Sequence, residues 1–323
     1  MKKTFAILTS GGDSPGMNCA IRSFVRTSIH SKNKVLGVYK GYEGLIDNEI
    51  SPLVASSVGN IIQRGGTILQ SSRSERFRTK AGRKAAAANL KKHNIDGLVV
   101  IGGDGSFKGA HKLSQEHGVH VVGIPGTIDN DISGTDYTIG HDTAVQTAIE
   151  AVDKIRDTAF SHDRVFLIEV MGRRSASLAL KVALATGAED VIMPSKNIPY
   201  KKIVEQIQRG IKRGKKGSIY IVAEGANEGR SYQIHDELLK KYKVSSRVCI
   251  LGHIQRGGSP SSKDRIIASL MGNIALDALN SRIKQSAVIS SSGGVSYTML
   301  EKCVNHADEG LKNYRELIQT LSI

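Results

Sequence analysis

The chain contains 323 residues, 40% of them hydrophobic, and its 34 glycines are spread among apolar runs. This composition excludes a low-complexity chain and is typical of a globular protein with room for two domain-sized cores. Forty-five lysines and arginines against thirty aspartates and glutamates leave a net charge of +15. That charge favours anionic partners such as nucleotides, phosphorylated metabolites or nucleic acid, without choosing among them.

Short apolar runs alternate with amphipathic segments of helical length almost from end to end, the pattern of βαβ units around a largely parallel sheet. In chain order, strands are expected at residues 4–9, 34–39, 97–101, 119–124, 165–170, 191–193, 219–223, 248–251 and 287–290. Helices are expected at residues 17–29, 81–93, 107–117, 143–158, 178–186, 201–212, 232–242 and 265–281. The predicted fold class is therefore α/β.

No linker rich in Pro, Ser or Gly divides the chain, so a lobe boundary is inferred from where the strand clusters change. We place it near Gly140 and expect the chain to cross back near Gly252, where glycine-rich, polar sequence resumes. This predicts two α/β lobes with mainly parallel sheets, residues 1–140 plus about 253–303 and residues 141–252 plus about 304–323. The active site is expected in the cleft between the lobes, at the carboxyl ends of the strands.

The cysteines and apolar runs indicate neither a zinc site nor a membrane protein. Cys19, Cys249 and Cys303 lie far apart with no C-x-x-C pair, and Cys249, in an apolar run, is expected to be a buried reduced thiol. The apolar run near the amino terminus is too short for a signal peptide, and no stretch approaches the roughly 18 residues needed to cross a bilayer. We expect a cytoplasmic protein without a membrane partner.

Two glycine turns follow predicted strands and precede predicted helices, at Gly11 to Asn18 and at Gly102 to Ser106. Glycine lets the backbone approach phosphate oxygens, and a helix N-terminus supplies free N–H groups. The first turn lacks a Walker A lysine and fits an ordinary strand-to-helix connection equally well. The second repeats the arrangement with Asp104, which is either a helix-capping acid or, as we favour, a magnesium ligand beside a nucleotide.

A third motif, Thr127 to Asp131, follows Pro125 and Gly126 at the end of a predicted strand. Asp129 and Asp131 point the same way if the segment is locally extended. One of them would take the proton of an attacking hydroxyl while the other steadies a metal or its water, and the alternative is a polar turn with no catalytic role.

Five arginines stand at strand ends or beside glycines, which is where phosphate groups are commonly bound: Arg73, Arg164, Arg173, Arg247 and Arg256. A guanidinium binds phosphate oxygens at two points and stabilises charge on a transferring phosphoryl group. Together with the acidic and glycine-rich loops, they indicate a small-molecule kinase whose site carries two anionic groups.

With these motifs, the chain resembles the bacterial-type ATP-dependent 6-phosphofructokinase family over essentially its whole length. The motifs that carry the resemblance, in order, are residues 11–18, 102–106, 125–131, 171–173 and 251–260. The resemblance implies a kinase that transfers the ATP γ-phosphoryl group to the 1-hydroxyl of fructose 6-phosphate, with Mg²⁺ as cofactor. It also implies a glycolytic homotetramer in which Arg164 and Arg247 serve the neighbouring subunit's site.

The resemblance assigns roles to residues of this sequence. Asp129 would be the base, Thr127 would orient the sugar 1-hydroxyl and Arg173 would stabilise the moving phosphoryl group. ATP would be held by Gly11, Arg73, Ser74, Gly103, Asp104, Gly105 and Ser106, with Asp104 on magnesium. Fructose 6-phosphate would be held by Thr127, Ile128, Asp129, Arg164, Met171, Gly172, Arg173, Glu224, Arg247, His253 and Arg256.

An effector pocket for ADP or phosphoenolpyruvate is also implied, with the residues Arg22, Arg26, Arg156, Glu189, Arg213 and Lys215. The chain departs from the family there, because Ala55 stands where an arginine is usual and Gly217 where one relative has histidine. We expect weakened or changed allosteric control. Two further departures lie near the sugar site: Ala176, where glycine is usual, and His141, where an aromatic residue such as phenylalanine is common.

The phosphoryl donor and two alternative functions complete the sequence predictions. Pyrophosphate-using relatives commonly carry Asp in place of Gly105 and Lys in place of Gly126, so the two glycines favour ATP. The alternatives are a pyrophosphate-dependent kinase or a kinase that acts on another sugar phosphate, and a non-catalytic regulatory or anion-binding paralogue. Retention of Asp104, Thr127, Asp129 and Arg173 argues against lost catalysis, and no basic stripe with interleaved aromatics supports a nucleic-acid partner.

Overall fold

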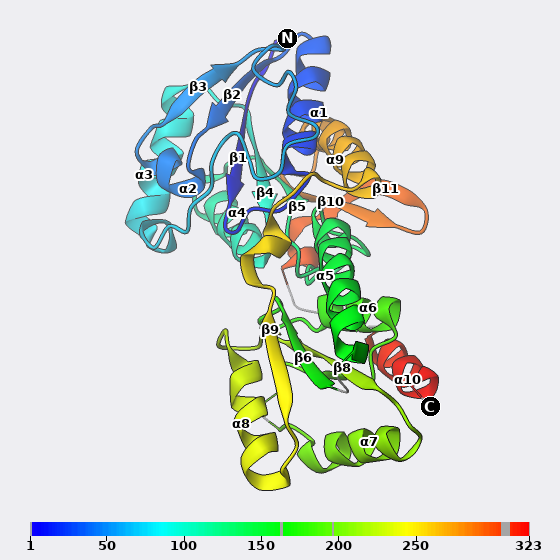
Figure 1. Ribbon diagram of the computed structural model, residues 1–323. Helices are drawn as coiled ribbons and strands as arrows, with labels where there is room; N and C mark the ends of the chain where they lie inside the picture. The colour runs from blue at the N-terminus through cyan, green and yellow to red at the C-terminus, as the bar shows by residue number, and fades with distance from the viewer. Residues whose placement is uncertain (1, 162–163, 196, 305–310, 323) are drawn as a thin grey trace. The chain divides into compact units, whose positions relative to one another are not determined.

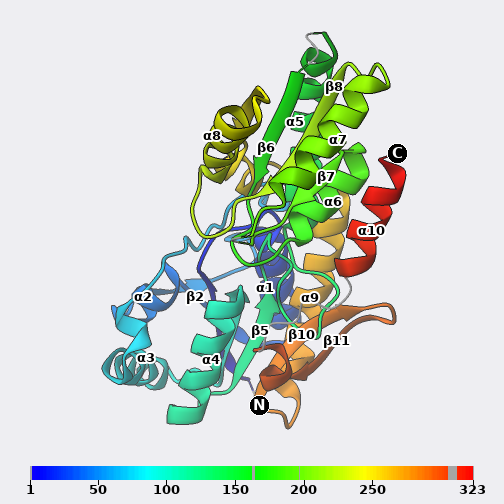
Figure 2. The same ribbon diagram turned by 90° about the horizontal axis from the view of Figure 1, so that it is seen from below.

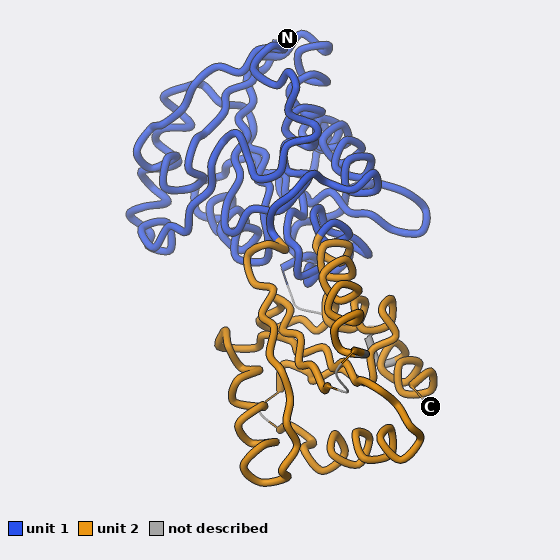
Figure 3. The backbone as a smooth tube through the Cα atoms, viewed as in Figure 1, with its two compact units in different colours: residues 1–143, 256–307 blue, residues 144–255, 308–323 orange. Residues whose placement is uncertain are grey.

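The computed structural model describes residues 2–161, 164–195, 197–304 and 311–322. The chain forms two compact units, which Figure 3 colours separately. Unit 1 consists of residues 1–143 and 256–307, and unit 2 of residues 144–255 and 308–323. Among the described residues, no helix is both long enough and apolar enough to span a membrane.

Unit 1 is built on a seven-stranded sheet in the order β11-β10-β5-β4-β1-β2-β3. Its strands are β1 (Thr4–Ser10), β2 (Lys34–Val38), β3 (Ile50–Leu53), β4 (Gly97–Gly102), β5 (Val121–Pro125), β10 (Gln285–Ser291) and β11 (Gly294–Met299). The pairs between β2, β1, β4, β5 and β10 are parallel, whereas the edge strands β3 and β11 pair antiparallel with their neighbours. The carboxyl ends of β1, β4 and β5 therefore share one edge of the sheet.

Helices cover both faces of this sheet, because its central strands are apolar on both sides. In β1, Phe5 and Ile7 belong to a core shared with α1 (Met17–His30) and α9 (Ser262–Asn280), which lie side by side (Figure 2). Ala6 and Leu8 point to the opposite face and belong to a second core. That core is shared with α2 (Gly41–Ile46), α3 (Lys80–Lys92) and α4 (Asp104–His117).

Unit 2 carries a four-stranded parallel sheet in the order β7-β8-β6-β9. Figure 1 labels three of these strands, β8, β6 and β9, side by side. Its strands are β6 (Arg164–Val170), β7 (Asp190–Ile192), β8 (Gly217–Ala223) and β9 (Ser246–Ile250). Its helices are α6 (Ser177–Thr186), α7 (Tyr200–Lys212), α8 (Arg230–Tyr242) and α10 (Leu311–Leu321), while α5 (His141–Ser161) begins in unit 1. Three 3₁₀ turns complete the described elements: η1 (Arg76–Arg78), η2 (Gly252–Arg256) and η3 (Leu300–Cys303).

The predicted fold class, α/β with mainly parallel sheets, is confirmed. Each predicted strand and helix has a counterpart whose ends differ by at most three residues. The sequence prediction omitted α2, β3, β11 and α10. The three cysteines are free, and burial raises the pKa of Cys19 and of Cys303 to about 11, so both thiols remain protonated at neutral pH.

Candidate active site

Three loops of unit 1 begin side by side at the carboxyl edge of its sheet. Ser10 is in register with Gly102, and Gly102 is in register with Pro125. The first glycine turn, the second glycine turn and the Thr127 to Asp131 motif follow these three strand ends directly. The carboxyl edge of a parallel sheet is where α/β proteins bind ligands, so the three sequence motifs form one candidate site.

The first two loops are joined by Ser106. Its Oγ donates a hydrogen bond of 3.0 Å to the carbonyl oxygen of Ser10, at the end of β1. A Cβ added to Gly102 would lie 2.5 Å from that same Oγ and 2.6 Å from the Ser10 carbonyl oxygen. Gly102 is therefore required by close packing between the loops, and the Ser106 hydroxyl has a structural partner.

The second loop begins α4, with Asp104 as its first residue. Asp104 Oδ2 lies 2.6 Å from Lys108 Nζ, one helical turn further on. A Cβ on Gly103 would lie 3.4 Å from Cβ of Thr127, which places the second loop against the third. A Cβ on Gly105 would meet no atom within 4 Å, so the space beside the helix N-terminus is open. This N-terminus can accept an anion through its first N–H groups.

The third loop turns sharply at Asp129. Thr127 Oγ1 accepts a hydrogen bond of 3.2 Å from the Asp129 N–H, and Asn130 has φ +48°. The segment is therefore not extended, so the premise by which Asp129 and Asp131 would point the same way is wrong. A threonine-based turn is present, and Asp129 is half-buried within it. The side chain of Ile128 is fully buried, so it can offer a ligand only its backbone.

A further segment of unit 1 lies against the first glycine turn. Gly11, at φ +87°, donates its N–H to the Ser72 carbonyl oxygen at 3.3 Å, which brings exposed Arg73 beside this turn. Ser74 Oγ donates to Glu43 and accepts from the N–H of Phe77, so its hydroxyl shapes the segment.

Arg256 belongs to unit 1 and lies against the first glycine turn. Its Nη1 donates a hydrogen bond of 3.0 Å to the Asp13 carbonyl oxygen. A Cβ on Gly12 would lie 2.5 Å from the same nitrogen. Arg256, expected at the sugar 6-phosphate, is thus grouped here with the residues expected to hold ATP.

In unit 2, four of the predicted sugar residues follow the carboxyl ends of β6 and β8, namely Met171, Gly172, Arg173 and Glu224. Val170 is in register with Ala223, so the residues that follow these strands start side by side. Arg173 Nε lies 3.9 Å from Glu224 Oε1. The N–H of Met171 donates to Gln255 Oε1 at 2.8 Å, which joins this edge to the turn that contains exposed His253.

Arg164 and Arg247 lie toward the opposite end of the same sheet. Arg164 is the first residue of β6, and Arg247 is in register with Phe166, two residues later. A strand of this length spans roughly 20 Å at about 3.3 Å per residue. The length of β6 therefore separates Arg164 from the strand end that leads to Arg173.

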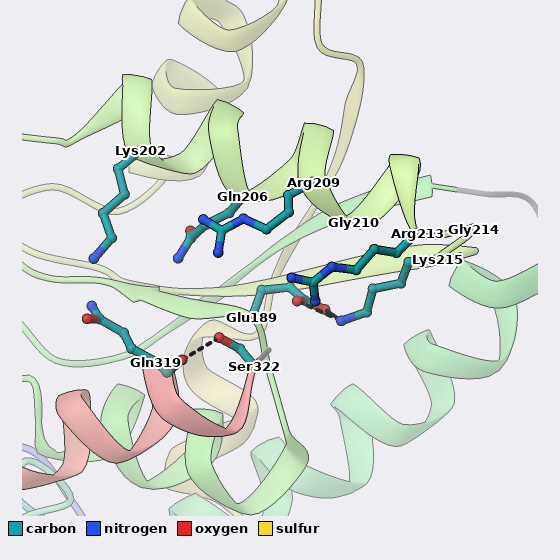
Figure 4. A pocket seen from close by; sticks show the side chains of 10 residues that line it. All are labelled: Glu189, Lys202, Gln206, Arg209, Gly210, Arg213, Gly214, Lys215, Gln319 and Ser322. Atoms are coloured by element: carbon teal, nitrogen blue, oxygen red, sulfur yellow. Dashed lines mark hydrogen bonds and ion pairs between the residues drawn. The ribbon is translucent and has the colours of Figure 1, made fainter.

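Of the six residues predicted for the effector site, three line one cavity and three do not. Glu189, Arg213 and Lys215 line a cavity of about 440 Å³ in unit 2, where Lys215 Nζ lies 2.6 Å from Glu189 Oε1 (Figure 4). Arg22 and Arg26 belong to α1 in unit 1, and Arg156 donates to the Thr186 carbonyl oxygen without lining the cavity.

The sequence analysis missed several residues of this cavity. Its further lining residues are Lys202, Gln206, Arg209, Gly210, Gly214, Gln319 and Ser322. Lys202, Gln206 and Arg209 recur at spacings of four and three residues, which places them on one face of α7. This periodicity in the sequence could have indicated that the three residues share one site. The lining carries four cationic side chains and one carboxylate, so the cavity favours anions.

Comparison with known proteins agrees with the geometry of the site. The family model described as phosphofructokinase matches residues 4–279. The chain is 50% identical to an ATP-dependent 6-phosphofructokinase of Staphylococcus epidermidis, covering 99% of this chain and 100% of the relative. It is 49% identical over 321 residues to ATP-dependent 6-phosphofructokinase 1 of Thermus thermophilus, covering 99% of this chain and 100% of the relative.

A solved structure of phosphofructokinase from Saccharomyces cerevisiae superposes with a TM-score of 0.86 at 35% identity, covering 99% of this chain. The present chain spans about half the length of that yeast chain, namely 47%. One assignment accounts for these similarities, for the three neighbouring loops in unit 1, and for Arg173 and Glu224 at the strand ends of unit 2. The chain belongs to the phosphofructokinase family.

Proposed function

We propose that the protein transfers the γ-phosphoryl group of ATP to the 1-hydroxyl of D-fructose 6-phosphate in glycolysis, giving fructose 1,6-bisphosphate and ADP. Relatives about half identical over nearly the full chain are named for ATP-dependent phosphofructokinase activity. The structural observation that carries the proposal is the close approach of Gly103 to Thr127, because it sets the loop of Asp104 beside the loop of Asp129. Phosphoryl transfer needs phosphate-binding backbone next to a proton acceptor.

Each loop of unit 1 has a part in this reaction. The turns at Gly11 and at Gly103 to Ser106 bind the ATP phosphates through backbone N–H groups, and exposed Arg73 adds positive charge beside the first turn. Asp129 accepts the proton of the sugar 1-hydroxyl, and the Thr127 turn holds Asp129 in place. Open space beside Gly105 leaves room for a nucleotide, which supports ATP as the donor.

The donor atoms fit a magnesium ion bound together with ATP. Mg²⁺ is usually held by one or two carboxylates, with phosphate oxygens and waters completing its coordination. Asp104 offers one carboxylate at the helix N-terminus, and within the described residues no cluster of three or more His, Cys, Asp or Glu offers an all-protein cage. When bound, the ion neutralises charge on the transferring phosphate. Asp104 would exchange its contact with Lys108 for this role.

The strand ends of unit 2 supply residues for the sugar and for the moving phosphoryl group. Arg173 stabilises charge on that group, while Glu224, Met171 and Gly172 contact the sugar. His253, in the η2 turn, and Arg256, which belongs to unit 1, are the residues proposed to bind the 6-phosphate. Since Arg164 and Arg247 lie toward the opposite end of the sheet from Arg173, we propose that they complete a neighbouring subunit's site in a cytoplasmic homotetramer.

The cavity of unit 2 is proposed to bind an anionic effector. Glu189, Arg213 and Lys215 line it, and Lys202 and Arg209 add positive charge from α7. Because Ala55 replaces a usual arginine, the affinity for ADP is expected to be weaker than in relatives with the full set. Regulation of the enzyme by ADP is therefore part of the proposal, in a weakened or altered form.

A coupled assay with ATP, Mg²⁺ and fructose 6-phosphate tests the function. We expect turnover that is lost in Asp129→Ala while ATP affinity is largely kept, because proton acceptance acts in the transition state. Pyrophosphate and a panel of sugar phosphates should be poorer substrates. Faster turnover with pyrophosphate than with ATP would reject ATP as the donor. Turnover of Asp129→Ala equal to that of wild type would reject Asp129 as the base.

A further inference from the structure

A segment of unit 1 outside the predicted site, Thr138 to His141, holds the loop that carries Asp129. The N–H of Ile139 donates to the Pro125 carbonyl oxygen at 2.9 Å. Thr138 Oγ1 donates to the Thr127 carbonyl oxygen at 2.6 Å. Three groups of this segment, those of Thr138, Ile139 and His141, thus bind backbone carbonyls of the residues that lead into Asp129.

The third contact comes from His141. Its Nδ1 lies 2.6 Å from the Ile128 carbonyl oxygen, and the side chain is 1% exposed. A carbonyl oxygen only accepts hydrogen bonds, so Nδ1 carries the proton and donates. The Ile128 carbonyl belongs to the peptide group that continues into Asp129, and this hydrogen bond therefore fixes the orientation of the Asp129 backbone.

Thr138 also contacts the turn through its backbone. Its N–H donates to Asn130 Oδ1 at 2.8 Å, on the far side of Asp129. Asn130, at φ +48°, is the residue whose conformation bends the loop. Thr138 therefore binds the residue two positions before Asp129 and the residue directly after it.

The supporting segment is itself anchored by a buried carboxylate. Asp264, in the first turn of α9, is 0% exposed. Its Oδ1 accepts from the Gly140 N–H at 2.7 Å, and its Oδ2 accepts from Thr143 N–H at 2.9 Å and from Thr143 Oγ1 at 2.5 Å. These contacts flank His141 on both sides, so the segment has little freedom to follow a moving loop.

We propose that Thr138 and His141 are positioning residues for the proposed reaction, which act by holding the backbone around Asp129 through the Thr127 and Ile128 carbonyls. The inference rests on the proposed role of Asp129 as the base. A base must lie within hydrogen-bond reach of the proton it accepts, and a misplacement of about 1 Å can lower a rate by 10²-fold. His141, which stands where phenylalanine is common, adds a donor that a phenyl ring lacks.

Two matched pairs of variants separate positioning from packing. Thr138→Val keeps the shape of the side chain but loses the hydroxyl, whereas Thr138→Ser loses a methyl group and keeps the hydroxyl. His141→Phe keeps an aromatic ring without a donor, whereas His141→Asn places an amide N–H near the position of Nδ1. Each variant is assayed for kcat, for KM of both substrates and for thermal stability.

We expect kcat to fall roughly 10- to 100-fold in Thr138→Val, and less in His141→Phe, with KM for ATP nearly unchanged. Thr138→Ser and His141→Asn should retain kcat much closer to wild type even where their thermal stability is lower. A kcat in Thr138→Val within about twofold of wild type, or a kcat that follows thermal stability across all four variants, would overturn the inference.

Hydrogen–deuterium exchange of the unliganded protein gives a readout that needs no turnover. Amides of residues 126–131 should exchange faster in Thr138→Val and in His141→Phe than in wild type, while those of β1 stay unchanged. Unchanged exchange in this loop would overturn the inference even if the wild type is an active kinase. Faster exchange in the two variants, together with a wild type that shows no fructose 6-phosphate turnover, would reject the proposed function and retain the support of the loop.

Discussion

Ser106 and Ser10 are joined by a hydrogen bond of 3.0 Å between the Ser106 hydroxyl and the Ser10 carbonyl oxygen, which ties the beginning of α4 to the end of β1. This bond passes directly over Gly102, whose missing side chain leaves the space that the bond occupies. The two glycine turns can approach each other at this edge only because no Cβ separates them.

Gly102→Ala should therefore damage both stability and nucleotide binding. The new Cβ would lie 2.6 Å from the Ser10 carbonyl oxygen, and backbone atoms cannot move aside as a flexible side chain can. Overpacking of this kind typically costs about 1–3 kcal/mol of unfolding free energy. Denaturant unfolding and ATP titration measure the two effects. Gly105→Ala is the matched control for stability, since its Cβ meets no atom within 4 Å; equal destabilisation by both would contradict the argument.

Gly105→Asp should lower the use of ATP without unfolding the protein. The open space at Gly105 accommodates the side chain, but its negative charge would lie at the helix N-terminus where we place the ATP phosphates. We expect kcat/KM for ATP to fall by at least 10-fold, the effect of about 1.4 kcal/mol, with thermal stability close to that of wild type. Gly105→Asn is a neutral control of similar size. If both variants lose ATP turnover equally, crowding rather than charge is responsible.

The sequence predicted most of the strands, helices and glycine turns of this protein, because these depend on residues close together in the chain. Runs such as Leu98 to Ile101 are apolar on both faces, and the glycine turns that follow them mark where parallel strands end. The edge strands β3 and β11 were missed because their pattern is weak, with Pro52 in one and largely exposed positions in the other. The conformation of Asn130 was missed because it depends on Thr138, eight residues away in sequence.

In the candidate site too, residues close together in the sequence could be predicted, whereas contacts between distant segments could not. Loop residues could be predicted from motifs and from a family resemblance. The part of the cavity lined by Gln319 and Ser322 could not, because it exists only after the end of the chain has folded beside α7. The placement of Arg164 far from Arg173 follows from the direction of β6.

Two inactive variants should restore activity when they are mixed, if subunits share sites as proposed. Arg164→Ala leaves Asp129 intact, and Asp129→Ala leaves Arg164 intact. In a mixed oligomer, some sites would combine the intact Asp129 of one protomer with the intact Arg164 of another. Each variant is unfolded and refolded alone and in an equimolar mixture, and turnover is compared. Mixed oligomers demonstrated by two affinity tags but lacking any regained turnover would contradict shared sites.

Acid should remove the stabilising effect of the pair formed by Arg83 and Glu116. Arg83 is 4% exposed, and its Nε and Nη2 donate to the Glu116 carboxylate at 2.6 and 2.8 Å. The hydrogen bonds from Arg83 hold the pKa of Glu116 below its usual value of 4.5. A carboxyl whose folded-state pKa is depressed contributes stability above its unfolded pKa, and this contribution is lost as the pH falls through the folded pKa.

The melting temperature of Glu116→Gln should therefore lie below that of wild type at neutral pH. The difference should begin to shrink near pH 4.5 and vanish at lower pH, once the wild-type carboxyl is protonated. Glu75→Gln is the control, because Glu75 forms a largely exposed pair with Arg78 and surface pairs contribute little. A constant difference between Glu116→Gln and wild type from pH 7 to pH 3 would show that packing, not charge, is lost.

Regulation by ADP should respond to the missing arginine at position 55. Removal of a guanidinium from an anion site typically costs about 1.5–3 kcal/mol of binding, or roughly 10- to 150-fold in affinity. We therefore expect Ala55→Arg to lower the ADP concentration needed for half-maximal activation, and Arg213→Ala to raise it. Activation is measured at subsaturating fructose 6-phosphate, with Arg282→Ala as the control, because Arg282 is exposed and does not line the cavity. Tight ADP binding in the wild type that Arg213→Ala leaves unchanged would show that this cavity is not the effector site.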